Sequence, residues 1–234
     1  MAQESTTSPT IAAYAFAIAT ALEQDGVAPE PLFQACSLPL PTTTDPMARL
    51  SNQEVARLFE AAVQATGDPC FGLKVAEAYH PGNLHALGYA LMASTSLRDF
   101  CQRLGKFYRI ISQNADIRSE EVEDEFRLVT GVRNTAEICV ETQDTFIALM
   151  LRFMRFIYSP LLNPVRLQLL RPDPGAQYRP VFDAYFKCDI SYGGDELVLA
   201  LDRSIVDAPL PGASRELAQM HDQTVMQYLK ELER

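Results

Sequence analysis

The histidines are the first residues to test for metal chemistry. His80 and His85 lie five residues apart, and the third histidine, His221, is far away in the sequence. Metal-binding pairs on a helix are typically spaced so that both imidazoles share one face, and a five-residue spacing does not do this. We therefore expect no metal site. His85 and Tyr89, one helical turn later, are candidate ligand contacts, although a partly buried histidine bonded to the main chain is the simpler interpretation.

A second candidate group interrupts the apolar segment TFIALMLRFMRFIY at residues 145–158. Arg152 and Arg155 are three apart and share a helical face, so two guanidinium groups beside Phe153 could bind a carboxylate. Alternatively, they mark a solvated edge or pair with surface acids.

Tyr108 is a separate candidate. Its ring could line an apolar cavity while its hydroxyl binds a ligand, or the hydroxyl could bond to a neighbouring carbonyl.

Motifs for catalysis are missing from the chain. It contains no G-x-S-x-G elbow, H-E-x-x-H pair, P-loop or G-x-G-x-x-G sequence. The acidic segment SEEVEDE at residues 119–125 lacks the oxygen spacing of a calcium loop and is typical of a solvated hairpin tip. The five cysteines include no C-x-x-C pair, which favours neither disulfides nor zinc and fits a reducing cytoplasm. We expect no enzyme activity and no cofactor.

Composition also restricts the partners. Against 20 Lys and Arg there are 30 Asp and Glu, and the net charge of -10 repels phosphate backbones and anionic membranes. The apolar run at residues 11–22 has no basic residue before it and is too short to span a bilayer. It predicts a soluble helix with Ser8 as N-cap, Pro9 as first helical residue and Gly26 just beyond its end. We expect a cytoplasmic protein.

Helical signals dominate residues 1–112. Ser51 and Glu54 form an S-x-x-E capping box before a run of apolar residues at helical spacing, and Gly67 ends that helix. A Ser-Thr-Ser turn at residues 94–96 joins two more helices. Helices are predicted at residues 29–36, 84–92 and 97–111.

From residue 115 the period changes to that of strands. Ile117, Phe126 and Leu128 alternate with charged residues on either side of the acidic segment, which predicts a hairpin. A second hairpin is predicted at Gly193-Gly194. The remaining elements are a long apolar helix at 138–158, a strand at 165–169, a helix at 178–186 and a return strand at 197–201. The class is therefore α+β, an N-terminal helical part followed by a mainly antiparallel sheet with packed helices.

One more helix is predicted at residues 214–233 after the PLPG break. It carries an apolar stripe at intervals of three and four residues: Leu217, Met220, Thr224, Val225, Tyr228 and Leu232. The stripe either packs on its own domain or forms part of a homodimer interface.

Several segments together resemble a known family. HPGNLHALGYALMASTSLRDFCQRLGKFYRIIS, IAAYAFAIATALEQDGV, LSNQEVARLFEAAVQATGDP and LVLALDRSIVDAPLPGASREL occur in an order and spacing similar to the N-terminal, non-cupin effector-binding domain of AraC-type bacterial transcription regulators, often labelled "arabinose-binding". The resemblance covers most of residues 10–219.

This resemblance implies a function. It predicts a ligand-sensing and dimerisation domain at residues 1–212, followed at residues 213–234 by a helix leading to a helix-turn-helix domain that this chain lacks and that would contact DNA. A small-molecule effector would lie between the helices at 84–92, 97–111 and 145–158, near His85, Tyr108 and Arg152. The second hypothesis is a stand-alone small-molecule binding protein, and the third is an enzyme with an unrecognised site.

Overall fold

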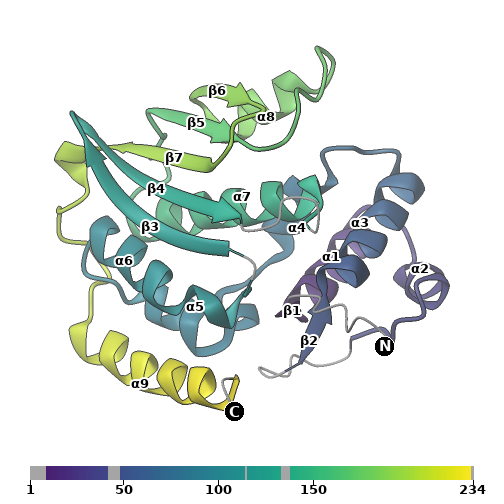
Figure 1. Ribbon diagram of the computed structural model, residues 1–234, viewed down its shortest axis with the longest axis horizontal. Coiled ribbons are helices and arrows are strands. Elements are labelled where there is room, and N and C mark those ends of the chain that lie inside the picture. Colours follow the sequence, from purple (N-terminus) through teal and green to yellow (C-terminus); the bar gives the residue numbers. More distant parts are fainter. Residues whose placement is uncertain (1–8, 42–47, 114, 133–137, 233–234) are drawn as a thin grey trace, which may run out of the picture.

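The computed structural model describes residues 9–41, 48–113, 115–132 and 138–232. The chain forms a helical half followed by a sheet with helices along one face, as Figure 1 shows, which confirms the predicted α+β class. The helices of the first half are α1 (Ala13–Gln24), α2 (Pro29–Ala35), α3 (Asn52–Thr66), α4 (Phe71–Ala78), α5 (His85–Met92) and α6 (Leu97–Phe107). Short 3-10 turns, η1 (Pro81–Leu84) and η2 (Tyr108–Ile110), precede α5 and follow α6.

Local sequence signals set the ends of α3. The Ser51 hydroxyl accepts a hydrogen bond from the Glu54 amide at 3.2 Å, and the Glu54 carboxylate accepts one from the Ser51 amide at 2.7 Å. Gly67 ends the helix with a φ of 67°, a conformation that glycine adopts without steric cost. Both predicted ends are confirmed, and between them the helix buries Val55, Leu58, Phe59 and Ala62.

The predicted start of the first helix is wrong. Pro9 belongs to a short strand, β1 (Pro9–Ile11), which pairs with β2 (Arg49–Ser51), and α1 begins only at Ala13. Ser8, the predicted N-cap, lies outside the described residues. The strand is held by long-range hydrogen bonds, because the Ile11 amide and the Thr10 hydroxyl both donate to the Ile111 carbonyl. These tertiary bonds outweigh the local preference of proline for a first helical turn.

The main sheet has five strands in the order β3-β4-β7-β5-β6. The predicted first hairpin is confirmed by antiparallel β3 (Ala115–Val122) and β4 (Glu125–Val132). The predicted second hairpin is wrong, because β5 (Arg166–Leu169) separates β6 (Asp189–Tyr192) from β7 (Leu197–Asp202). The Gly193 and Gly194 amides bind the Arg171 and Leu169 carbonyls, so the turn crosses the end of β5 instead of closing a hairpin.

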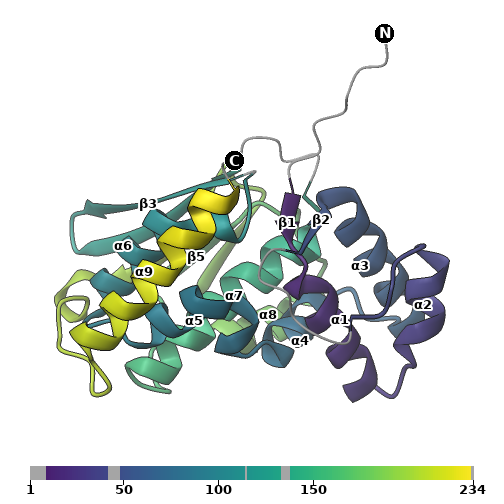
Figure 2. The same ribbon diagram turned by 90° about the horizontal axis from the view of Figure 1, so that it is seen from below.

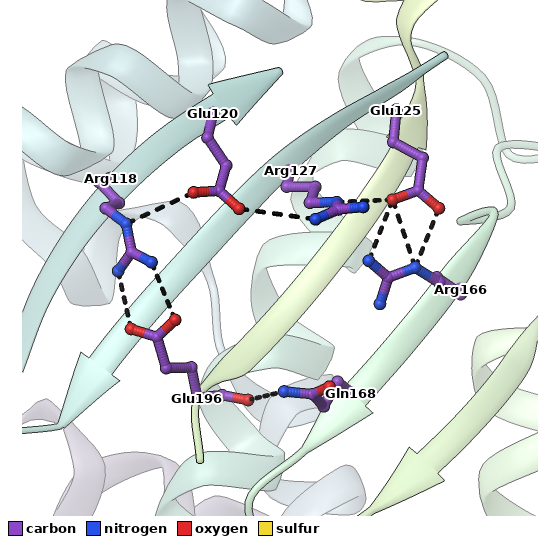
Figure 3. A network of polar contacts seen from close by, with 7 residues as sticks. All are labelled: Arg118, Glu120, Glu125, Arg127, Arg166, Gln168 and Glu196. Atoms are coloured by element: carbon purple, nitrogen blue, oxygen red, sulfur yellow. Dashed lines mark hydrogen bonds and ion pairs between the residues drawn. The ribbon is translucent and has the colours of Figure 1, made fainter. Parts of the chain in front are cut away.

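The two faces of this sheet differ in chemistry. Phe126, Leu128 and Thr130 of β4 point to the inner face, opposite the buried leucines of β7. The outer face carries a ladder of ion pairs, shown in Figure 3, which links β3, β4, β5 and the start of β7. Its pairs are Arg118–Glu196 at 2.8 Å, Arg118–Glu120 and Arg127–Glu120 at 3.7 Å, Arg127–Glu125 at 2.6 Å and Arg166–Glu125 at 2.9 Å.

Two long helices complete the fold. The apolar helix α7 (Val140–Ile157) packs against α4 and against α8 (Arg179–Phe186), which accounts for burial on several of its sides. The last helix, α9 (Arg215–Leu232), lies along α5 and α6, as Figure 2 shows from below. Over the described residues, no helix is long and apolar enough to cross a membrane.

The packed face of α9 differs from the predicted stripe. Ala218 and Val225 are buried, whereas Leu217 and Met220 remain 50% and 58% exposed. Arg103 of α6 holds the helix through an ion pair with Asp222 at 2.8 Å. Part of the apolar stripe therefore packs on its own domain, and an adjoining apolar strip remains on the surface.

Candidate ligand-binding site

The predicted site residues fall into separate places. A surface pocket of about 480 Å³ lies beside the C-terminal half of α7 and contains Arg152, Phe153 and Arg155. Tyr108 instead lines a small interior cavity of about 30 Å³. The rest of the surface pocket is formed by His80, Pro81, Met92, Phe156 and Pro160.

Arg152 is engaged at the end of α4. Its Nη1 donates to the main-chain carbonyls of Tyr79 at 2.6 Å and Ala76 at 3.3 Å, and its Nε lies 3.2 Å from a Glu77 carboxylate oxygen. The last carbonyls of a helix lack partners within the helix and carry partial negative charge, so a guanidinium group stabilises them. Arg152 therefore caps α4.

Arg155 has a similar position at the end of α8. Its Nε donates to the Leu162 carbonyl and its Nη1 to the Tyr185 carbonyl, both at 2.8 Å, and its Nη2 donates to the Phe186 carbonyl at 3.2 Å. Burial lowers the pKa of this guanidinium from its usual value. Both guanidinium groups are hydrogen-bonded to main-chain carbonyls. The arginine pair could bind a carboxylate only if these hydrogen bonds were broken.

His85 and Tyr89 lie at the junction of α5 and α9. His85 starts α5 with a φ of 51° and is half-buried, whereas the Tyr89 ring is 50% exposed. Tyr89 stacks on His221 of α9, with ring centroids 5.5 Å apart. Neither residue is among the described residues that line the two cavities, so the structure does not bring the six predicted residues into one site.

The interior cavity lies where elements distant in sequence meet. Its walls come from β1, the starts of α1 and α3, the end of η2, the inner face of the sheet and the first turns of α7. The lining residues are Thr10, Tyr14, Asn52, Tyr108, Ser112, Ala115, Thr130, Val132, Ile138, Thr142, Gln143, Phe146 and Leu197. Apolar walls with a few polar groups are the mixture that small-molecule sites use, and the volume of about 30 Å³ restricts this cavity to one small group of a ligand.

Three polar side chains of this cavity lack a hydrogen-bond partner for one atom. Among the described residues, nothing binds Nδ2 of Asn52, Oγ1 of Thr130 or Oε1 of Gln143. The three residues are only 7%, 3% and 8% exposed. Buried polar groups are nearly always paired, because an unpaired one loses its hydration without compensation. Three such atoms around one cavity make it a candidate site for a polar group of a ligand.

Two tyrosines and a cysteine complete the environment. Burial raises the pKa of Tyr14 and of Tyr108 well above the usual value, although a hydrogen bond with Ser112 acts against this for Tyr108. Burial also raises the pKa of the Cys139 thiol to about 11. These groups are therefore protonated at neutral pH, and the tyrosines present hydroxyl donors. The Tyr108 ring is fixed by an edge contact with Phe146 at a centroid distance of 5.4 Å.

Asn52, Thr130 and Gln143 were missed by the sequence predictions. One signal was present for Thr130, since it follows Phe126 and Leu128 on the same face of an alternating strand and is therefore a polar residue on the buried side. Asn52 and Gln143 gave no such signal, because their proximity arises only from tertiary packing.

Metal and redox chemistry receive no support from side-chain clusters. Within the described ranges, no three His, Cys, Asp or Glu side chains are grouped to hold a metal ion. All five cysteines are free thiols.

The chain was compared with known proteins. Residues 26–210 match the family model described as the arabinose-binding domain of AraC transcription regulators, N-terminal. The crystal structure of the transcriptional regulator CdpR from Pseudomonas aeruginosa has a similar fold, with a TM-score of 0.56 and 16% identity. The match covers 86% of this chain and 64% of CdpR, so the chain spans less than two thirds of that regulator. No curated protein sequence matches significantly. On the family match, which extends over most of its length, the chain belongs to the family of N-terminal arabinose-binding domains of AraC transcription regulators.

Proposed function

We propose that this chain is the ligand-sensing domain of a bacterial AraC-type regulator, acts in the cytoplasm and is not an enzyme. The observation that carries the proposal is the interior cavity with three unpaired buried polar atoms, in a domain of a regulator family. A ligand changes transcription only if it binds one arrangement of the regulator more tightly than another. The interior cavity lies between the helical half and the sheet, so a ligand that fills it alters how these two halves pack. Ligand binding can therefore favour one arrangement of the regulator over another.

DNA binding belongs, in this proposal, to another domain of the whole regulator. The net charge of -10 opposes the release of counterions that drives binding to phosphate backbones. We expect the isolated chain to show no salt-sensitive binding to duplex DNA at micromolar concentration. Submicromolar binding would contradict this assignment.

Dimerisation is the second part of the proposal and involves α9. Leu217 and Met220 expose apolar side chains next to the packed face of this helix, and such a strip is suited to contact with a second copy. We expect a dimer by light scattering at about 50 µM, a concentration at which a micromolar interface is occupied. Replacing both residues by Glu should give a monomer, whereas the same change at exposed Gln219 and Gln223 of α9 should not.

The sensing function is tested by a thermal-shift screen against bacterial metabolites. A ligand that binds only the folded state raises stability by RT ln(1 + [L]/Kd), so an effector should raise the melting temperature in a concentration-dependent manner. At a concentration of about 100 times Kd the gain is about 2.7 kcal/mol. If a broad library, including sugars, amino acids and organic acids, gives no saturable shift, the proposed function is wrong.

A further inference from the structure

The interior cavity restricts the charge of what it can bind. Its described lining consists of apolar residues, hydroxyl groups and amides, and includes no Lys, Arg, His, Asp or Glu. A carboxylate or ammonium group placed there would lose its hydration and meet no opposite charge among the described lining residues. The arginine pair that could compensate a carboxylate lines the other pocket, where its donors bind helix carbonyls.

The unpaired atoms also define which neutral group fits. The Nδ2 of Asn52 is a donor, the Oε1 of Gln143 is an acceptor, and the hydroxyl of Thr130 can be either. The orientation of the Gln143 amide is fixed because its Nε2 donates to the Ile138 carbonyl at 3.2 Å. A carboxylate only accepts and an ammonium only donates, whereas a hydroxyl or a primary carboxamide does both.

We infer that the interior cavity binds a neutral hydroxyl or carboxamide group of the effector, with Asn52, Thr130 and Gln143 as its hydrogen-bond partners. This rests on the proposed sensing function and adds the chemical class of the ligand. The cavity of about 30 Å³ is roughly twice the minimum that one water molecule requires, so it accommodates a group of two or three heavy atoms.

Formamide and formate provide a matched pair of probes, because each has three heavy atoms, and they have nearly the same shape and differ in charge. Methyl resonances of Thr130 and Val132, which both line the cavity, would be followed by NMR during titration with each probe at neutral pH. We expect formamide to shift both resonances saturably with a Kd of about 10 mM, and formate to leave them unchanged up to about 200 mM.

Variants locate the binding. Gln143→Met removes the acceptor at similar volume and should weaken formamide binding about tenfold, or about 1.4 kcal/mol. Thr130→Val, followed through the Val132 methyls, should do the same. Phe156→Ala is the matched control in the surface pocket, where this side chain is 79% exposed, and should leave the affinity unchanged.

The outcomes separate this inference from the sensing function. Equal binding of formate and formamide, loss of binding only in the Phe156→Ala variant, or no saturable shift with formamide would each overturn the inference. In the last case the cavity holds water alone. A metabolite that stabilises the protein but carries its charge into the surface pocket would retain the sensing function and reject this site.

Discussion

Replacing Arg171 tests how the first turns of α7, which line the interior cavity, are held in place. Arg171 follows β5 and forms a buried ion pair with Asp144 of α7, and the two side chains are only 7% and 1% exposed. Its guanidinium also lies 4.7 Å from the centre of the Phe182 ring. Arg171→Met keeps most of the side-chain volume and removes the positive charge, which leaves the Asp144 carboxyl buried without its cationic partner.

The destabilisation caused by Arg171→Met depends on pH because the Asp144 carboxyl titrates. Burial raises the pKa of Asp144 to about 7, against the lowering effect of Arg171. The folded state therefore binds more protons than the unfolded state, and this contribution to stability declines as pH rises from the ordinary pKa towards the folded one. Without Arg171 the folded pKa rises further, so the decline continues to higher pH, at about 1.4 kcal/mol per pH unit.

Two contributions determine how much Arg171→Met should lower the free energy of unfolding. At about pH 5 the carboxyl is protonated, and Arg171→Met should cost about 1–2 kcal/mol from the lost contact with the Phe182 ring. At about pH 8 the variant carboxyl, whose pKa lies above the wild-type value of about 7, adds about 1.4 kcal/mol for the one pH unit beyond that value, which raises the cost to about 2.5–3.5 kcal/mol.

Urea unfolding followed by circular dichroism at both pH values measures this difference. The double variant Asp144→Asn, Arg171→Met is the control and should lose the pH dependence. A cost of Arg171→Met that is equal at the two pH values, or below about 1 kcal/mol at the higher one, would refute the reasoning.

Three further predictions concern stability. Gly88→Ala should lower the free energy of unfolding in urea by about 3 kcal/mol, since a Cβ there would lie 1.9 Å from the Pro81 carbonyl oxygen. Gly212→Ala is the control and should be neutral, because a Cβ at that position has no neighbour within 4 Å. Equal losses in the two variants would contradict this. Hydrogen bonds from Arg166 and Arg127 lower the pKa of Glu125, so its contribution is present above the ordinary pKa of about 4.3 and is lost as pH falls through the folded value. Glu125→Gln should lower stability at neutral pH and flatten its acid dependence, and an unchanged acid profile would argue against it. Thr130→Val without ligand should change stability by less than about 1 kcal/mol, because the lost hydroxyl has no protein partner among the described residues; a larger loss would show that the hydroxyl is already satisfied.

Local patterns predicted the elements well where capping residues and periodicity coincide. The Ser51–Glu54 box, the Gly67 terminus, the helix pair around residues 94–96 and the β3–β4 hairpin all depend on neighbours in sequence, and the structure confirms them. The two errors have a common cause. The strand that contains Pro9 is held by hydrogen bonds from Thr10 and Ile11 to Ile111, which lies 101 and 100 positions away. The turn at Gly193-Gly194 is held by bonds to residues 22 and 25 positions away, and no local window contains either set.

The candidate site could be predicted only in part. Tyr108 was identified from its amphipathic chemistry, and it lines the interior cavity. The arginine pair was recognised as unusual, but its function as a cap on α4 and α8 depends on carbonyls contributed by those other helices. Asn52 and Gln143 are adjacent only because α3 and α7 meet the sheet at the same point. Such convergence follows from tertiary packing and not from spacing.

The most direct measurement is a crystal structure of the protein with the metabolite that stabilises it most in the thermal-shift screen. The account predicts ligand density in the interior cavity, with a neutral hydroxyl or carboxamide group within hydrogen-bond distance of Asn52, Thr130 and Gln143. Density confined to the surface pocket beside Phe156, with the interior cavity occupied by water alone, would contradict it.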